Sequence, residues 1–147
     1  MRIVGRPPMS AKIKKIVMAN GVFDMLHYGH LLHLEQAKSF GDILWVSVTD
    51  DQHVRKGPGR PIYPQEQRLA LIKALRVVDK AITCSGLIEA LDIIRPHILV
   101  KGIDYKEGLH EVHEKYCREH GIEIKYTDTP KLSATEFIYE SKRSAKY

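Results

Sequence analysis

The sequence contains few cysteines and no long hydrophobic run, and each absence excludes a class of protein. Cys84 and Cys117 are its two cysteines in 147 residues and lie far apart, which argues against a disulfide framework and favours two small buried apolar side chains. No apolar segment approaches the roughly 20 residues that a membrane-spanning helix needs, and the first residues lack the apolar core of a signal peptide. We therefore expect a cytoplasmic protein with no membrane partner.

A basic patch interleaved with aromatic residues is also absent, although the formal net charge is +5. Lysine and arginine are spread along the chain, so a nucleic-acid partner would rest on net charge alone. We interpret the charge as a solvated surface plus a phosphate-binding pocket. The length fits one domain, expected over residues 12–147, after an irregular arm at residues 1–11 in which Pro7 and Pro8 exclude a helix.

Apolar segments of two kinds alternate along the chain and predict strands followed by helices. Strands are expected at 13–19, 42–49, 78–83, 97–100 and 122–126, the last of them at a sheet edge. Helices are expected at 29–40, 65–77, 87–94, around 109–120 and at 133–140. The fourth of these helices would turn Leu109, Val112 and Tyr116 inward and end at Gly121. This alternation predicts an α/β fold, a single-domain, doubly wound parallel sheet of the Rossmann-like kind.

The segment between the first strand and the first helix carries the strongest functional signal. It contains Gly21, which allows an anion to approach the backbone, and two imidazoles, His27 and His30, at the start of a helix. A helix start presents unpaired N–H groups and the positive end of its dipole. Imidazoles add donors that can carry charge near neutral pH. The pattern predicts a site for a polyphosphate whose negative charge grows during reaction.

Two other interpretations of these histidines are weaker. His27, His30 and His33 could bind a metal, but no cysteine or carboxylate beside them completes a ligand set, so we predict no protein-held metal. They could also be buried histidines with satisfied hydrogen bonds. Neither interpretation accounts for the glycines and the strand–turn–helix setting. We expect His33 to be ordinary helix surface.

The residues Gly-Val-Phe-Asp at 21–24 and His-Tyr-Gly-His at 27–30 resemble the signature of the cytidylyltransferase type of nucleotidyltransferase. Enzymes of that family join a nucleoside triphosphate to a phosphorylated small molecule and release pyrophosphate. The resemblance implies that His27 and His30 are catalytic and bind the nucleotide phosphates. It also implies that Gly21, Val22 and Phe23 line the nucleotide site and that Asp24 lies between nucleotide and substrate.

A basic loop with two glycines and two prolines follows the second strand, at residues 56–61. Taken alone, Lys56 and Arg60 would be solvated surface residues. A loop at that position opens at the same sheet edge as the first turn, where it can close over a triphosphate. The family has a lysine in such a loop and an arginine on the next helix, which implies a catalytic role for Lys56 and a nucleotide contact for Arg68.

A second candidate nucleotide segment follows the fourth strand. Gly102 permits a sharp exit from the strand, Asp104 can accept hydrogen bonds from a base or ribose, and Tyr105 can stack on a base, although a plain turn is an equal alternative. The segment at 100–105 is similar to that of sugar-phosphate adenylyltransferases, the heptose-phosphate branch in particular. That likeness adds Lys101 to the nucleotide site, while Ile103 stands where the branch has a second glycine.

The segment near the C-terminus has a helix-start pattern in which Ser133 and Glu136 form a capping box. The family resemblance adds that Ser133 and Thr135 contact the nucleotide phosphates, while Ala134 departs from the family pattern. Asp128 stands where glycerol-phosphate cytidylyltransferases have an arginine.

These observations favour transfer of a nucleoside monophosphate from ATP to a sugar phosphate, with Mg²⁺ or another divalent cation carried by the nucleotide. One alternative is a CTP-dependent enzyme acting on a polyol or amino-alcohol phosphate such as glycerol 3-phosphate. Another is a nucleotide-binding regulatory module without turnover, suggested by the departures at Ile103, Ala134 and Asp128. Family likeness also implies a homodimer.

Overall fold

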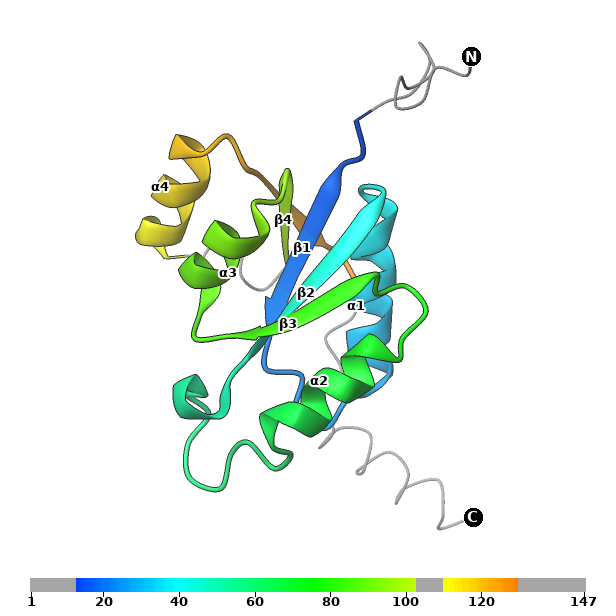
Figure 1. Cartoon of the computed structure of the whole chain (residues 1–147), viewed down its shortest axis with the longest axis vertical. Helices are drawn as coiled ribbons and strands as arrows, with labels where there is room; N and C mark the ends of the chain where they lie inside the picture. The colour runs from blue at the N-terminus through cyan, green and yellow to red at the C-terminus, as the bar shows by residue number, and fades with distance from the viewer. Residues whose placement is uncertain (1–12, 103–109, 130–147) are drawn as a thin grey trace, which may run out of the picture.

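The computed structural model describes residues 13–102 and 110–129 of the chain, which form one parallel sheet with helices on both faces (Figure 1). The strands lie in the order β3-β2-β1-β4-β5. They are β1 (Ile16–Gly21), β2 (Ile43–Thr49), β3 (Lys80–Cys84), β4 (Ile98–Gly102) and β5 (Glu123–Thr127). The helices are α1 (Tyr28–Ser39), α2 (Gln65–Lys73), α3 (Leu87–Ile94) and α4 (Glu111–Glu119), with a 3-10 turn, η1 (Asp51–His53), after β2. The predicted doubly wound sheet is confirmed, with β5 at an edge.

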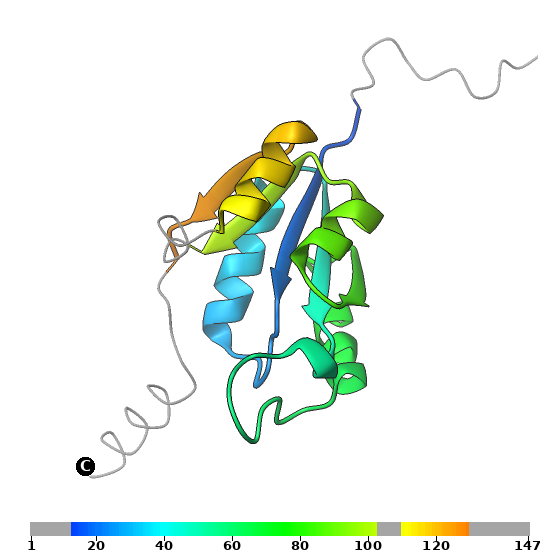
Figure 2. The ribbon, with the colours of Figure 1, turned by 90° about the vertical axis from the view of Figure 1, so that its left-hand side faces the viewer.

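The central strand β1 explains why helices are needed on both faces. Successive side chains of a strand point to opposite faces, and Val17, Met18 and Ala19 are all fully buried. Val17 and Ala19 belong to the apolar cluster under α1 and α2. Met18 belongs to the cluster under α3 and α4. Figures 1 and 2 show these two helix pairs on opposite sides of the sheet.

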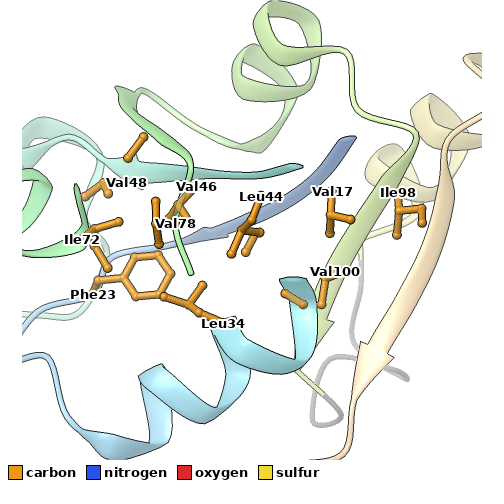
Figure 3. Close-up of a cluster of buried hydrophobic side chains, with 13 residues drawn as sticks. Val17, Phe23, Leu34, Leu44, Val46, Val48, Ile72, Val78, Ile98 and Val100 are labelled. Carbon is orange, nitrogen blue, oxygen red and sulfur yellow. The ribbon is translucent and has the colours of Figure 1, made fainter. Parts of the chain in front are cut away.

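The larger cluster reaches the turn after β1 and fixes it to the core. The Phe23 ring lies beside Leu34 of α1 and Ile72 of α2, with strand side chains continuing the row (Figure 3). Phe23 is 6% exposed, and Leu34 and Ile72 are fully buried. Packing of Phe23 in the core therefore fixes the backbone of the turn that carries the candidate site.

Some predicted boundaries and faces differ from the structure. Pairing of β1 with β2 starts at Ile16, and Ile13 is 86% exposed rather than part of the strand. Helix α2 ends at Lys73 instead of residue 77, because tight turns closed by Leu75 N to Ile72 O and by Val78 N to Leu75 O lead the chain into β3.

The inner face of α4 also differs from the prediction. Val112 was expected inside and is 68% exposed, whereas Cys117 is the side chain that α4 buries and Tyr116 packs beside it. The expected arm at 1–11 and the expected helix at 133–140 lie outside the described residues. No helix in the part of the chain that the structure describes is long and apolar enough to cross a membrane.

Candidate active site

The candidate site lies where the strand order reverses. β1 lies between β2, which continues the chain on one side, and β4, which starts the other half of the sheet. Gly21 is in register with Val48 and Ala19 with Val100, so extending the second register by two residues places Gly102 level with Gly21. The carboxyl ends of these three strands meet at a topological switch point, where open α/β sheets bind ligands.

The turn after β1 has an unusual backbone. Phe23 and Met25 have φ values of 53° and 54°, in the left-handed region that side chains other than glycine seldom occupy. Such conformations persist where surrounding packing enforces them, and they cluster at functional sites. A Cβ on Gly21 would come within 3.0 Å of the Phe23 ring. Gly21 thus makes room for Phe23, in addition to the role expected for it in anion approach.

His27 and His30 form a reciprocal cap at the start of α1. His27 is the N-cap, and its Nδ1 accepts from Gly29 N at 3.0 Å, while His30 Nδ1 accepts from His27 N at 3.1 Å. Their rings are stacked with centroids 4.0 Å apart. Since each Nδ1 is an acceptor, the proton of each neutral ring lies on Nε2. The cap therefore gives both rings the same tautomer, with Nε2–H as the second hydrogen-bonding group.

Burial favours the neutral form of both imidazoles, whereas the sequence suggested donors that can carry charge near neutral pH. Burial, with smaller effects of His27, Lys56 and His33, lowers the pKa of His30 to about 4. Burial also lowers the pKa of His27 below its usual 6.5. In its neutral form each ring offers Nε2–H as a hydrogen-bond donor. The charge of Lys56 contributes to the lowered pKa of His30, which places this loop lysine within electrostatic range of His30.

Asp24 anchors the loop between β2 and α2 to the turn. Its side chain is fully buried and accepts from Arg60 Nε at 2.8 Å, Ile62 N at 2.7 Å and Tyr63 N at 3.0 Å. Burial raises the pKa of Asp24, but the hydrogen bonds from Ile62, Tyr63 and Arg60 outweigh it and hold that pKa below its ordinary value. Figure 2 shows the loop passing beside the turn. Contact between Asp24 and a substrate stays a prediction, and its carboxylate has a structural task that sequence reasoning missed.

Arg68 supports the site from within the fold, whereas the sequence predicted a contact with the nucleotide. Its side chain has no exposed surface, and its guanidinium donates to three backbone carbonyls and one carboxylate. These acceptors are Tyr63 O (2.9 Å from Nε), Val22 O and Thr49 O (2.9 and 2.7 Å from Nη1) and Asp51 Oδ1 (2.6 Å from Nη2). Arg68 thereby joins the ends of β1 and β2, η1 and the loop.

His33 is not ordinary helix surface, contrary to the prediction. Its Nδ1 lies 2.7 Å from Thr127 Oγ1, and Thr127 is 1% exposed at the end of β5. One turn further along α1, Gln36 Oε1 accepts from Asp128 N. α1 is therefore tied to the carboxyl end of the edge strand. Spacing along α1 placed His33 three residues from His30, but no sequence signal identified its partner.

Of the remaining predicted nucleotide contacts, only some lie among the residues that the structure describes. Lys101 and Gly102 end β4 at the same sheet edge as the turn. Burial, together with Lys101 and then His110, lowers the pKa of His113 at the start of α4. The other predicted contacts, Asp104, Tyr105, Ser133 and Thr135, lie outside the described residues.

Asp24 is the carboxylate of the turn, and hydrogen bonds from the loop already occupy its oxygens. Within residues 13–102 and 110–129, no group of three or more His, Cys, Asp or Glu side chains is placed to hold a metal ion. Mg²⁺ commonly keeps several waters and is bound through substrate phosphates with one or two carboxylates.

A comparison with protein families matches a region that includes both the sheet and the turn after β1. The model of a family described as cytidylyltransferase-like matches residues 18–140. The chain belongs to this family. This confirms the resemblance carried by the turn and, with it, the class of enzyme, a nucleotidyltransferase.

Curated relatives are similar to this chain over nearly its whole length. It is 40% identical over 141 residues to the bifunctional protein HldE of Methylococcus capsulatus, covering 93% of this chain and 30% of that protein. It is 42% identical over 138 residues to HldE of Azotobacter vinelandii, covering 90% of this chain and 29% of that protein. The chain thus spans about 30% of the length of these relatives.

Solved structures give the same fold. The lipopolysaccharide core biosynthesis protein of Thermoplasma volcanium is similar with a TM-score of 0.67 and 34% identity, over 82% of this chain and 99% of that one. The pantothenate synthetase of Thermus thermophilus matches with a TM-score of 0.61 at 16% identity, over 89% of this chain and 64% of that one, which shows the fold alone.

Proposed function

We propose that the protein transfers the nucleoside monophosphate of a nucleoside triphosphate, with ATP favoured, to a sugar phosphate and releases pyrophosphate. The observation that carries this proposal is the pair of imidazoles locked in one tautomer at the start of α1, at the switch point of the sheet. An oxygen of the acceptor's phosphate attacks the α-phosphorus, a new P–O bond forms, and the bond from the α-phosphorus to the bridging oxygen breaks. No side-chain nucleophile takes part.

Catalysis would depend on positioning and on charge stabilisation. The Nε2–H groups of His27 and His30 would donate to phosphate oxygens as negative charge grows, together with the N–H groups at the start of α1. Lys56 would neutralise the leaving pyrophosphate from the loop. Mg²⁺ carried by the triphosphate would supply Lewis-acid stabilisation of the same oxygens.

The choice of ATP and of a sugar phosphate rests on likeness. The loop at 56–61 and the segment at 101–105 resemble sugar-phosphate adenylyltransferases. The Thermoplasma relative is described by its part in making a lipopolysaccharide core, which is a saccharide. Lys101, Gly102, Asp104 and Tyr105 would then face the nucleoside, and Ser133 and Thr135 the phosphates. By the same family likeness we propose a cytoplasmic homodimer, with no nucleic acid or membrane as partner.

A thermal-shift panel of ATP, CTP, GTP and UTP with Mg²⁺ tests nucleotide binding without an acceptor. A ligand at a hundred times its dissociation constant stabilises by about 2.7 kcal/mol, a shift of several degrees for a chain of this size. A shift with ATP is expected. A shift with CTP alone would favour the cytidylyltransferase acting on a polyol or amino-alcohol phosphate, and no shift with any nucleotide would refute the proposal.

Pyrophosphate release with a panel of aldose phosphates tests turnover, and His30→Ala tests the mechanism. Removing one preorganised donor to the transition state typically costs about a hundredfold to a thousandfold in rate. His120, at the C-terminal end of α4, provides the matched control, because His120→Ala removes an imidazole far from the turn. Nucleotide binding without release for any acceptor would favour the regulatory module. A loss below tenfold in His30→Ala, with substrates saturating, would remove His30 from the catalytic step.

A further inference from the structure

Arg60 is held at the candidate site by a buried carboxylate. Its Nε donates to Asp24 Oδ2 at 2.8 Å, and the Asp24 side chain is fully buried while that of Arg60 is 33% exposed. The backbone N–H groups of Ile62 and Tyr63 complete the environment of the carboxylate. Arg60 is therefore oriented through its Nε, at the inner end of its guanidinium.

The outer end of that guanidinium remains available for an anion. Among the hydrogen bonds of the described residues, Nη1 and Nη2 of Arg60 have no acceptor. The neighbouring Arg55 differs, because its Nη1 donates to Gln52 O of η1 at 3.0 Å. Arg68 differs too, because its guanidinium is buried among four acceptors. A guanidinium fixed at Nε presents its two terminal N–H groups as a fork, which suits two oxygens of one phosphate.

We propose that Arg60, oriented by Asp24, binds the phosphate group of the acceptor, which makes it a residue that selects phosphorylated substrates. This inference rests on the proposed function, since it assigns a subsite of the same reaction. Arg60 is held at Asp24, which the family resemblance places between nucleotide and substrate, so its fork is assigned to the acceptor. Lys56, the other cation of the loop at 56–61, keeps its proposed role at the leaving pyrophosphate. Asp24 is a positioning residue, and its predicted contact with substrate becomes an indirect one through Arg60.

Steady-state kinetics of Arg60→Ala test this assignment through the KM of each substrate. A hydrogen bond to a charged group corresponds to an affinity change of about tenfold to a hundredfold. The KM for the sugar phosphate should rise by that factor, while the KM for the nucleotide stays within about twofold. Arg60→Lys should not restore the acceptor KM, because an ammonium group cannot both hold Asp24 and present a fork. Arg55→Ala, in the same connection between β2 and α2, is the matched control and should leave both values unchanged.

Asp24→Asn provides a second test, because it keeps the side-chain shape and weakens the hold on Arg60. If Asp24 acts through Arg60, the double variant with Arg60→Ala should have the acceptor KM of Arg60→Ala alone. In Arg60→Ala, an equal rise in the KM for the sugar phosphate and the KM for the nucleotide would overturn the inference. Unchanged KM values with only a lower melting temperature would also overturn it and leave Arg60 with a purely structural role in the loop.

Calorimetric titration separates this inference from the proposed function. Glucose 1-phosphate and inorganic phosphate are titrated into wild type and Arg60→Ala, with a non-reactive ATP analogue present. Binding that weakens in Arg60→Ala supports the inference even if no acceptor turns over, in which case the proposed function fails alone. Equal behaviour of the two proteins, including no measurable binding by either, overturns the inference even if wild type releases pyrophosphate.

Discussion

Arg68→Met should destabilise the protein strongly before any ligand is added. The substitution keeps an unbranched side chain of similar length, so it removes the guanidinium with little loss of packing. It leaves three backbone carbonyls and the Asp51 carboxylate without the donors that now serve them. Because the Arg68 side chain has no exposed surface, water is poorly placed to replace those donors.

The magnitude follows from the cost of an unpaired buried group. Each carbonyl left unsatisfied costs about 1–3 kcal/mol when buried, and breaking a buried ion pair costs about 3–5 kcal/mol. These costs overlap, and the Asp51 side chain is 40% exposed, so its own loss is smaller. We expect a loss of about 3–5 kcal/mol, a large share of the 5–15 kcal/mol that stabilises a typical domain. The melting temperature should fall by about 10 °C or more.

Urea denaturation of wild type, Arg68→Met and Asp51→Asn measures these losses, with Asp51→Asn expected to lose only about 1 kcal/mol. If Arg68→Met does not fold at all, Asp51→Asn still reports the exposed end of the same network. Contrary evidence would be an Arg68→Met protein within 1 kcal/mol of wild type that binds the nucleotide much more weakly. That outcome would restore a direct contact between Arg68 and the nucleotide.

Two further predictions concern other parts of the fold. Gly41→Ala should cost about 1–3 kcal/mol, because its Cβ would lie 2.6 Å from Val17 Cγ2 and 2.9 Å from Lys15 O, whereas Gly86→Ala, with nothing within 4 Å, should stay within about 0.5 kcal/mol by urea denaturation. The stability of wild type should fall as pH drops from 6.5 towards 4, by about 1–3 kcal/mol, since the unfolded His30 takes up a proton before the folded one does. His30→Gln should flatten that part of the curve, and parallel curves would contradict the pKa assigned to His30.

Local pattern predicted the parts of this molecule that depend on neighbours in sequence. Alternating apolar segments gave the parallel sheet, and the glycine, two histidines and helix start gave the turn at the switch point. Partners distant in sequence were not predictable in this way. The sequence shows that Asp24 and Arg60 are charged, but a separation of 36 positions conceals their pairing. The family resemblance assigned Arg68 to the nucleotide by its position on the helix after the loop, and its complete burial shows that it also holds the fold together.

Burial favours the neutral form of the two histidines, so the positive charge of the site has to come from other side chains. An imidazolium pair at the helix start would attract the triphosphate directly, but burial keeps His30 uncharged and lowers the pKa of His27. The helix start and two Nε2–H groups then provide direction rather than net charge. The loop supplies two formal cations, Lys56, which influences His30, and Arg60, which Asp24 holds, and Lys101 at the end of β4 is a third. Asp24 and Arg68 anchor that loop to the turn, which holds its cations beside the histidines that we propose orient the phosphates.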